Sequence, residues 1–141
     1  MAEKLLIVDD EPDMLRLLQM IVKEKTPYEV TTTNNPLEAL GLAKKGGFDL
    51  LITDLKMPGL DGIELLNSVR DFDADIPIII ITAFATAEAA DEAMEKNAFD
   101  FITKPFRKEQ ILFTIEKAIK WLRTQRENKM LRESLGKNQS Q

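Results

Sequence analysis

Five short strand-forming runs recur along the chain, and a stretch with helical periodicity follows each of them. The runs are 4–8, 28–33, 50–53, 77–82 and 98–103. Those at 4–8, 50–53 and 77–82 consist largely of Leu, Ile and Val, without the polar alternation of a half-exposed strand. Such strands are typically buried on both faces. The sequence therefore predicts an α/β fold, in which helices cover both faces of a parallel sheet.

The helical stretches place apolar residues three and four positions apart. We expect helices over 12–25, 36–44, 63–71, 86–96 and 107–135. Proline at position 12 suits the first turn of a helix, and Gly46-Gly47 is a typical helix end. The small, polar residues 136–141 are expected to form a disordered tail.

The central run Leu50–Thr53 leads directly into Asp54, and the chain then turns at Pro58-Gly59. This pattern indicates a buried strand with Asp54 at its carboxyl end. Ligands of open parallel sheets bind at the carboxyl ends of strands. A carboxylate in this position acts as a metal ligand, a nucleophile or a helix cap.

Polar residues also follow the other predicted strands. Asp9, Asp10 and Glu11 follow the first strand, Thr82 ends the fourth and Lys104 follows the fifth. Because all carboxyl ends of a parallel sheet lie on one rim, we expect these groups to converge with Asp54. Each residue alone has a simpler explanation, as a helix cap or a solvated side chain. Their combination at successive strand ends favours a shared site.

Composition limits the chemistry of that site. The chain has no Cys and no His, which excludes thiolate zinc sites, disulfides and a histidine base. Clustered carboxylates repel one another unless a cation lies among them, and oxygen ligands favour Mg²⁺, with Mn²⁺ as a substitute. A metal, a carboxylate, a hydroxyl and an ammonium together suit a phosphoryl group.

Charge is distributed unevenly around a net value of -5. Residues 116–141 carry seven basic and three acidic side chains, so the acidic excess lies in residues 1–115. An acidic body argues against direct nucleic-acid binding. No stretch has the length of a membrane span, and the first residues lack a signal peptide. We therefore expect a cytoplasmic protein with no membrane partner.

The residues at the strand ends resemble the receiver domain of two-component response regulators over about residues 3–122. The matching motifs are Asp9-Asp10, Thr53–Gly62 around Asp54, Thr82-Ala83 and Lys104-Pro105-Phe106. The resemblance implies a flavodoxin-like (CheY-like), doubly wound sheet of five parallel strands, in the order 2-1-3-4-5. In this chain the last helix would be extended.

The resemblance also implies a role for each acidic residue. Asp54 would be the phosphoacceptor, taking a phosphoryl group from a cognate sensor histidine kinase. Mg²⁺ would be held by Asp10, Asp54 and the backbone carbonyl of Lys56, with Asp9 acting through water. The chain would be a switch and not a turnover enzyme, limited to phosphotransfer onto itself and autodephosphorylation.

Three further residues receive roles by the same resemblance. Lys104 would pair with a phosphoryl oxygen, and a cis peptide bond before Pro105 would aim Lys104 inward. Thr82 would hydrogen-bond to another phosphoryl oxygen and vacate space that Phe101 could enter, so that both residues form the switch. Phe101 lacks the hydroxyl of the tyrosine that is frequent there, which predicts coupling by packing alone. Phe101 as an ordinary core residue is an equally simple interpretation.

The residues of Ile81–Phe84, Glu92–Met94 and Ala98–Phe106 look most like receivers of NtrC-type, sigma-54-dependent activators. In those proteins a helical linker joins the receiver to an AAA+ ATPase and a DNA-binding module. Neither output module fits within the 141 residues, so we expect a receiver over 1–122 and a linker, with coiled-coil spacing at Asn128, Leu131 and Leu135, over 123–135. A stand-alone receiver is the alternative. Homodimers would use this linker and the face formed by helix four, strand five and helix five.

Three other functions fit the residues less well. A magnesium-dependent phosphatase of the haloacid-dehalogenase type needs a second Asp two positions after the nucleophile, where this chain has Lys56. A flavin mononucleotide-binding module needs a phosphate-cradling loop after strand one, which Asp9-Asp10-Glu11 would repel. A receiver-like scaffold that is never phosphorylated would have no use for the complete set of acidic, Thr and Lys residues.

Overall fold

One sheet of five parallel strands forms the centre of the molecule, in the order β2-β1-β3-β4-β5. A computed structural model of the chain describes residues 2–139, with side chains described through Leu135. The strands are β1 (Lys4–Val8), β2 (Glu29–Thr33), β3 (Leu50–Thr53), β4 (Ile78–Thr82) and β5 (Asp100–Thr103). The helices are α1 (Pro12–Lys25), α2 (Pro36–Lys45), α3 (Gly62–Phe72), α4 (Ala87–Glu95) and α5 (Lys108–Gln139). The predicted fold class and strand order are confirmed.

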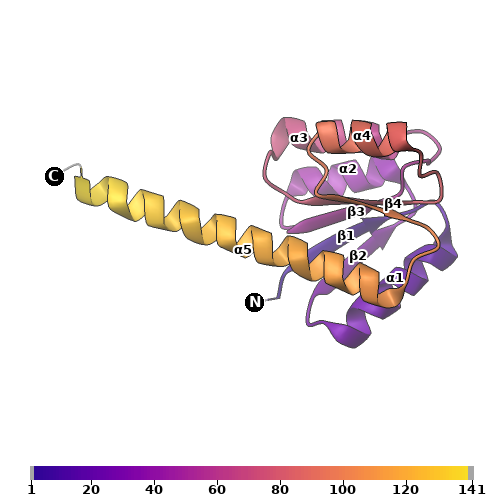
Figure 1. The fold of residues 1–141 in the computed structure, drawn as a ribbon, viewed down its shortest axis with the longest axis horizontal. Coiled ribbons are helices and arrows are strands. Elements are labelled where there is room, and N and C mark those ends of the chain that lie inside the picture. The colour runs from indigo at the N-terminus through magenta and orange to yellow at the C-terminus, as the bar shows by residue number, and fades with distance from the viewer. Residues whose placement is uncertain (1, 140–141) are drawn as a thin grey trace.

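Helices cover both faces of the sheet, with α1 and α5 on one side and α2, α3 and α4 on the other (Figure 1). Successive residues of a strand point to opposite faces. Thus Leu5 and Ile7 of β1 belong to the core under α1 and α5. Leu6 and Val8 belong to the core under α2, α3 and α4. This double burial explains why β1 reads as an unbroken apolar run.

The strand register brings the ends of β1 and β3 to the same level. Val8 pairs with Thr53, and the amide of Asp54 donates a 3.1 Å hydrogen bond to the carbonyl of Val8. Asp9 and Asp54 therefore leave the sheet side by side at its carboxyl rim.

Short polar caps fix where the helices begin. Asp61 and Glu64 form a reciprocal capping box at the start of α3, with hydrogen bonds of 2.8 and 3.2 Å. Thr86 caps α4 by accepting a 3.0 Å hydrogen bond from the amide of Ala89. After α4, Asn97 adopts φ 68°, the left-handed conformation in which helices commonly end.

The last helix, α5, is longer than the sequence indicated. It continues through Gln139, so 136–139 are helical where we predicted a disordered tail. A glycine inside a helix costs only about 1 kcal/mol relative to alanine, which makes Gly136 a weak stop signal. Ser140 and Gln141 lie outside the described residues. Within 2–139, no helix has both the length and the apolar character needed to cross a membrane.

Candidate functional site

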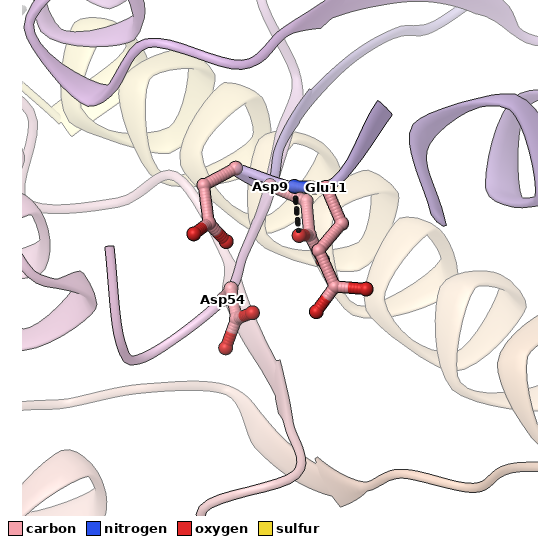
Figure 2. Close-up of side chains that lie close together, drawn as sticks. Asp9, Glu11 and Asp54 are labelled. Carbon is pink, nitrogen blue, oxygen red and sulfur yellow. Dashed lines mark hydrogen bonds between the residues drawn. The ribbon is translucent and has the colours of Figure 1, made fainter. Parts of the chain in front are cut away.

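Four carboxylates meet at the carboxyl rim of the sheet. One ligand atom from each of Asp9, Asp10, Glu11 and Asp54 lies within 4.8 Å of the others. Figure 2 shows Asp9 and Glu11 after β1 and Asp54 after β3, with their carboxylates gathered in one place. The predicted convergence of these residues is confirmed as geometry. Glu11 belongs to the cluster, although the family resemblance implied no role for it.

The ammonium of Lys104 reaches into this cluster from the end of β5. Its Nζ atom lies 2.8 Å from Oδ2 of Asp9 and 3.2 Å from Oδ2 of Asp54. The side chains of all three are nearly buried, with 10%, 2% and 5% of their surface exposed. The peptide bond between Lys104 and Pro105 is cis, as predicted. The structure thus brings the predicted cation into direct contact with two of the predicted carboxylates.

Backbone amides hold the two buried carboxylates in place. Oδ1 of Asp9 accepts a 2.9 Å hydrogen bond from the amide of Glu11, which Figure 2 marks with a dashed line. Oδ1 of Asp54 accepts a 2.6 Å hydrogen bond from the amide of Leu55. In both residues, Oδ2 is the atom that contacts Lys104. Each carboxylate therefore has one oxygen fixed by the backbone and one held by a movable side chain.

Burial sets the electrostatics of the cluster. Burial raises the pKa of Asp9 above its usual range, although hydrogen bonds from Lys104 and the amide of Glu11 partly oppose this. Burial alone would lower the pKa of Lys104, but its contacts with Asp9 and Asp54 outweigh burial and raise that pKa. Lys104 therefore stays charged, while the Asp9 carboxylate carries a desolvation cost that an additional cation would offset.

The composition of the cluster fits a hard divalent cation. All four side chains offer carboxylate oxygens, which Mg²⁺ and Mn²⁺ prefer. Asp10 and Glu11 are exposed to solvent, whereas Asp9 and Asp54 are buried. The cluster therefore has an open side from which an ion and its water ligands could enter.

Thr82 lies at the end of β4, and its side chain is fully buried. Its carbonyl accepts a 2.8 Å hydrogen bond from the amide of Lys104, which links the β4 and β5 ends. Its hydroxyl oxygen accepts a 3.1 Å hydrogen bond from the amide of Phe84 and contacts neither Asp54 nor Lys104 among the hydrogen bonds of the described residues. The sequence pattern located Thr82 on the rim but could not reveal its bond to Phe84.

The remaining predicted residues lie around this cluster. Phe101 pairs with Ile80 in the β4–β5 register and is partly buried against the core under α2, α3 and α4. Phe101 thus lies beside the middle of β4, two residue positions before the level of Thr82, and its switching role stays a prediction. Lys56 lies two residues after Asp54 with an exposed side chain, in the loop that leads to α3.

Comparison with known proteins assigns the family. Residues 5–116 match the family model for the response regulator receiver domain. The chain belongs to the response regulator receiver family. The resemblance inferred from the strand-end motifs is therefore confirmed. In this receiver, the residues that carry the resemblance are the ones that the fold gathers on the carboxyl rim of the sheet.

Individual relatives differ in overall length. Sporulation initiation phosphotransferase F of Bacillus subtilis is 37% identical over 117 residues, covering 83% of this chain and 94% of that protein. The C4-dicarboxylate transport transcriptional regulatory protein DctD of Pseudomonas aeruginosa is 31% identical over 132 residues, covering 94% of this chain but 28% of that protein. The crystal structure of NtrX from Brucella abortus superposes with a TM-score of 0.85 at 29% identity, covering 93% of this chain and 30% of that one.

NtrC-type activators are thus present among the relatives of this receiver, as the sequence predicted, beside other response regulators. The chain spans only about a quarter to a half of several of these relatives. ZraR of Klebsiella oxytoca is covered to 26%, and YkoG of Bacillus subtilis to 50%. The family assignment therefore concerns the receiver domain.

Proposed function

We propose that Asp54 is the phosphoacceptor of a two-component switch and takes its phosphoryl group from the phosphohistidine of a sensor histidine kinase. The phosphorus–nitrogen bond to the histidine breaks, a bond from phosphorus to an Asp54 carboxylate oxygen forms, and the released imidazole takes a proton. The observation that carries this proposal is the contact of Lys104 with both Asp9 and Asp54 inside a carboxylate cluster. Buried ion pairs of this kind contribute little net stability, which favours a functional reason for the cluster.

Mg²⁺, or Mn²⁺ in its place, fits this proposal as the cation of the site. Asp10, Asp54 and the backbone carbonyl of Lys56 would hold it, with Asp9 acting through water, and it would offset the repulsion between two anionic groups. Lys104 can then leave Asp54 for a phosphoryl oxygen, because the ammonium already lies in the crevice and stays charged. Asp9 keeps the other contact of Lys104 and limits how far the ammonium moves.

Switching would begin at Thr82. Its hydroxyl accepts the amide hydrogen bond of Phe84, so turning this hydroxyl toward a phosphoryl oxygen would break or bend that contact. Phe84 lies in the loop before α4, so rotation of the Thr82 hydroxyl would move this loop. The same rotation would vacate space that Phe101 could enter. Replacement of Phe101 by alanine should weaken phosphorylation-linked dimerisation. Unchanged dimerisation would remove Phe101 from the switch.

Homodimerisation is the output that the surface supports. The α5 stripe consists of Phe113, Lys117, Trp121, Asn128, Leu131 and Leu135, which lie on one side of the helix. Near the sheet, Trp121 packs on Phe99 with ring centroids 5.9 Å apart, and Lys117 pairs with Asp100 at 3.1 Å. Farther along, Leu131 and Leu135 are 54% and 58% exposed. The spacing of this outer part suits a parallel coiled coil that continues the α4–β5–α5 face.

We also propose that the switch controls an NtrC-type transcription activator, because NtrC-type activators are among the relatives named above. A second copy of the chain is the only partner needed for dimerisation, and the kinase is needed for phosphorylation. An AAA+ module and a DNA-binding module would have to come from polypeptide outside residues 1–141.

Incubation with Mg²⁺ and acetyl phosphate, followed by intact-protein mass spectrometry, tests the phosphoacceptor directly. We expect one phosphoryl adduct, which is lost in Asp54→Asn and without Mg²⁺, and kept in Asp71→Asn. Asp71 is an exposed carboxylate near the carboxyl end of α3, and the opposite end of this helix is the one next to Asp54. Acetyl phosphate turnover without an adduct would support the phosphatase instead. The absence of both adduct and turnover would support an unphosphorylated scaffold.

A further inference from the structure

The loop that follows Asp54 brings the first residue of α3 back into contact with the residues at which the loop begins. The amide of Gly62, the first residue of α3, donates a 2.7 Å hydrogen bond to the carbonyl of Leu55. The carbonyl of Asp54 meanwhile accepts a 2.9 Å hydrogen bond from the hydroxyl of Thr53. The start of α3 therefore lies directly against the backbone of the proposed phosphoacceptor, with Lys56 in the loop between them.

This contact leaves no space for a side chain at position 62. A Cβ atom added to Gly62 would lie 2.3 Å from the carbonyl oxygen of Asp54, 2.9 Å from Cα of Leu55 and 3.1 Å from the carbonyl carbon of Asp54. All three are backbone atoms, so no rotation of a side chain relieves the overlap. The requirement for glycine at 62 arises from close approach, whereas Gly59 in the same loop serves a turn with φ 90°.

Both sides of the contact are anchored. The capping box of Asp61 and Glu64 and the buried side chain of Ile63 hold the start of α3. The hydrogen bond to Val8 holds the amide of Asp54, and the amide of Leu55 holds its carboxylate at 2.6 Å. A side chain at 62 must therefore shift the peptide between Asp54 and Leu55, lift the start of α3, or do both. Either movement changes where the Asp54 carboxylate and the Lys56 carbonyl stand.

We infer that Gly62 is a positioning residue for the site: its missing side chain lets α3 press against Asp54 and so sets the geometry of the Asp54 carboxylate and the Lys56 carbonyl. This inference rests on the proposed function of Asp54. Gly62 contacts the backbone of Asp54 and Leu55 and acts on the site through these two residues.

The chain offers a matched control for Gly62→Ala. Gly41 is an exposed glycine inside α2, and a Cβ atom there would meet nothing within 4 Å. Gly41→Ala makes the same chemical change without an overlap and should raise the melting temperature, because alanine favours helix. Mg²⁺ affinity is measured first by calorimetric titration with MgCl₂ and no phosphodonor. The phosphorylation rate is then measured with acetyl phosphate at saturating Mg²⁺.

For Gly62→Ala we expect the Mg²⁺ dissociation constant to rise about 10-fold or more, and the phosphorylation rate at saturating Mg²⁺ to fall by a similar factor. Gly41→Ala should leave both within about 2-fold, as expected for a site that touches no functional group. If Gly62→Ala matches the wild type in both quantities, the inference is overturned.

Two further variants distinguish a changed site geometry from a general loss of stability. Val69 is a buried residue in the second half of α3, away from the contact with Asp54. Val69→Ala therefore destabilises α3 without moving its start, and we expect wild-type Mg²⁺ affinity from it while it remains folded. An equal loss of Mg²⁺ affinity in Val69→Ala would assign the effect to α3 stability and overturn the inference. If Gly62→Ala alone is unfolded, the Gly41→Ala/Gly62→Ala double variant is measured in its place, against Gly41→Ala.

The inference and the proposed function fail in different ways. If the wild-type protein forms no adduct with Mg²⁺ and acetyl phosphate, the phosphoacceptor proposal fails and the positioning role fails with it. If the wild type forms the adduct and Gly62→Ala forms it at the same rate with the same Mg²⁺ affinity, only the positioning role fails.

Discussion

Lys104 donates a 2.8 Å hydrogen bond from Nζ to Oδ2 of Asp9, although 95 positions separate the two residues in the chain. The same ammonium lies 3.2 Å from Asp54, so one positive charge serves two buried carboxylates. Breaking a buried ion pair leaves an uncompensated charge and is more destabilising than losing a surface pair. Lys104 therefore holds the two carboxylates together at the rim of the sheet.

Replacement of Lys104 by methionine should lower the free energy of unfolding in EDTA by about 3 kcal/mol, because Asp9 and Asp54 lose their shared cation. Mg²⁺ should then stabilise the variant more than the wild type, since an ion can supply the missing charge. Urea denaturation with EDTA and with MgCl₂ measures both effects. Lys108→Met, at an exposed position on α5, is the control. Equal stability of Lys104→Met and wild type in EDTA would contradict the prediction.

Arg70 joins three segments of the chain. From α3 its guanidinium donates hydrogen bonds to the carbonyls of Ile76 at 2.6 Å and of Asn97 at 2.9 Å. Arg70→Met would leave these carbonyls without their charged donor, and we expect a loss of about 2–3 kcal/mol in the free energy of unfolding. Arg16→Met is the control, because Arg16 and Asp13 form an exposed pair whose loss should cost at most about 1 kcal/mol. Similar losses from both variants, by urea denaturation, would refute the role of Arg70.

Tyr28 gives the protein a pH dependence in the alkaline range. Its hydroxyl donates a 3.0 Å hydrogen bond to Glu116, and burial, followed by that hydrogen bond and charge, raises the pKa of Tyr28 to about 12. The phenol has a pKa of about 10 in the unfolded chain, so folding favours its neutral form. Its contribution to stability is fully present below about pH 10 and is lost as pH rises through about 12, with a slope of at most about 1.4 kcal/mol per pH unit.

The difference in free energy of unfolding between wild type and Tyr28→Phe should therefore be constant up to about pH 9 and then fall, as the linkage relation requires. Other titrating groups are common to both proteins and cancel in this comparison. Because Tyr28 is the single tyrosine, its phenolate absorbance reports the pKa directly. An absorbance midpoint near the ordinary tyrosine value of about 10 would show that Tyr28 is neither buried nor hydrogen-bonded to Glu116 in solution.

The residues whose convergence the sequence predicted correctly are those that follow the strand ends. Asp9, Asp54 and Lys104 each follow an apolar run, and parallel topology places such residues on one rim. The local sequence pattern was sufficient for these three residues. Each buried strand ends where its apolar run ends, and the parallel sheet brings these ends together. The cis bond before Pro105 has no such local signal and was predictable only through the family resemblance.

The features that the sequence could not reveal depend on single contacts between distant or backbone atoms. The bond between the Thr82 hydroxyl and the Phe84 amide leaves no periodic trace, and neither does the approach of Gly62 to Asp54. Glu11 was visible after the first strand, but the direction of its side chain was not. The predicted end of α5 was too early, because Gly136 was taken as the end of the helix although a glycine inside a helix costs only about 1 kcal/mol.

The outer part of the α5 stripe gives the last prediction, which concerns association. Leu131 and Leu135 are exposed apolar side chains on the same side of the helix as Trp121, and aspartate at both positions would place buried charges in a coiled-coil seam. We expect Leu131→Asp/Leu135→Asp to weaken dimerisation of the protein treated with Mg²⁺ and acetyl phosphate by at least about 10-fold, equivalent to about 1.4 kcal/mol. Sedimentation equilibrium measures the dimer constant. Met130→Asp is the control, because Met130 is 69% exposed but lies off the stripe. Equal weakening by Met130→Asp would point to a general charge effect, and no weakening in the double variant would restrict dimerisation to the α4–β5–α5 face.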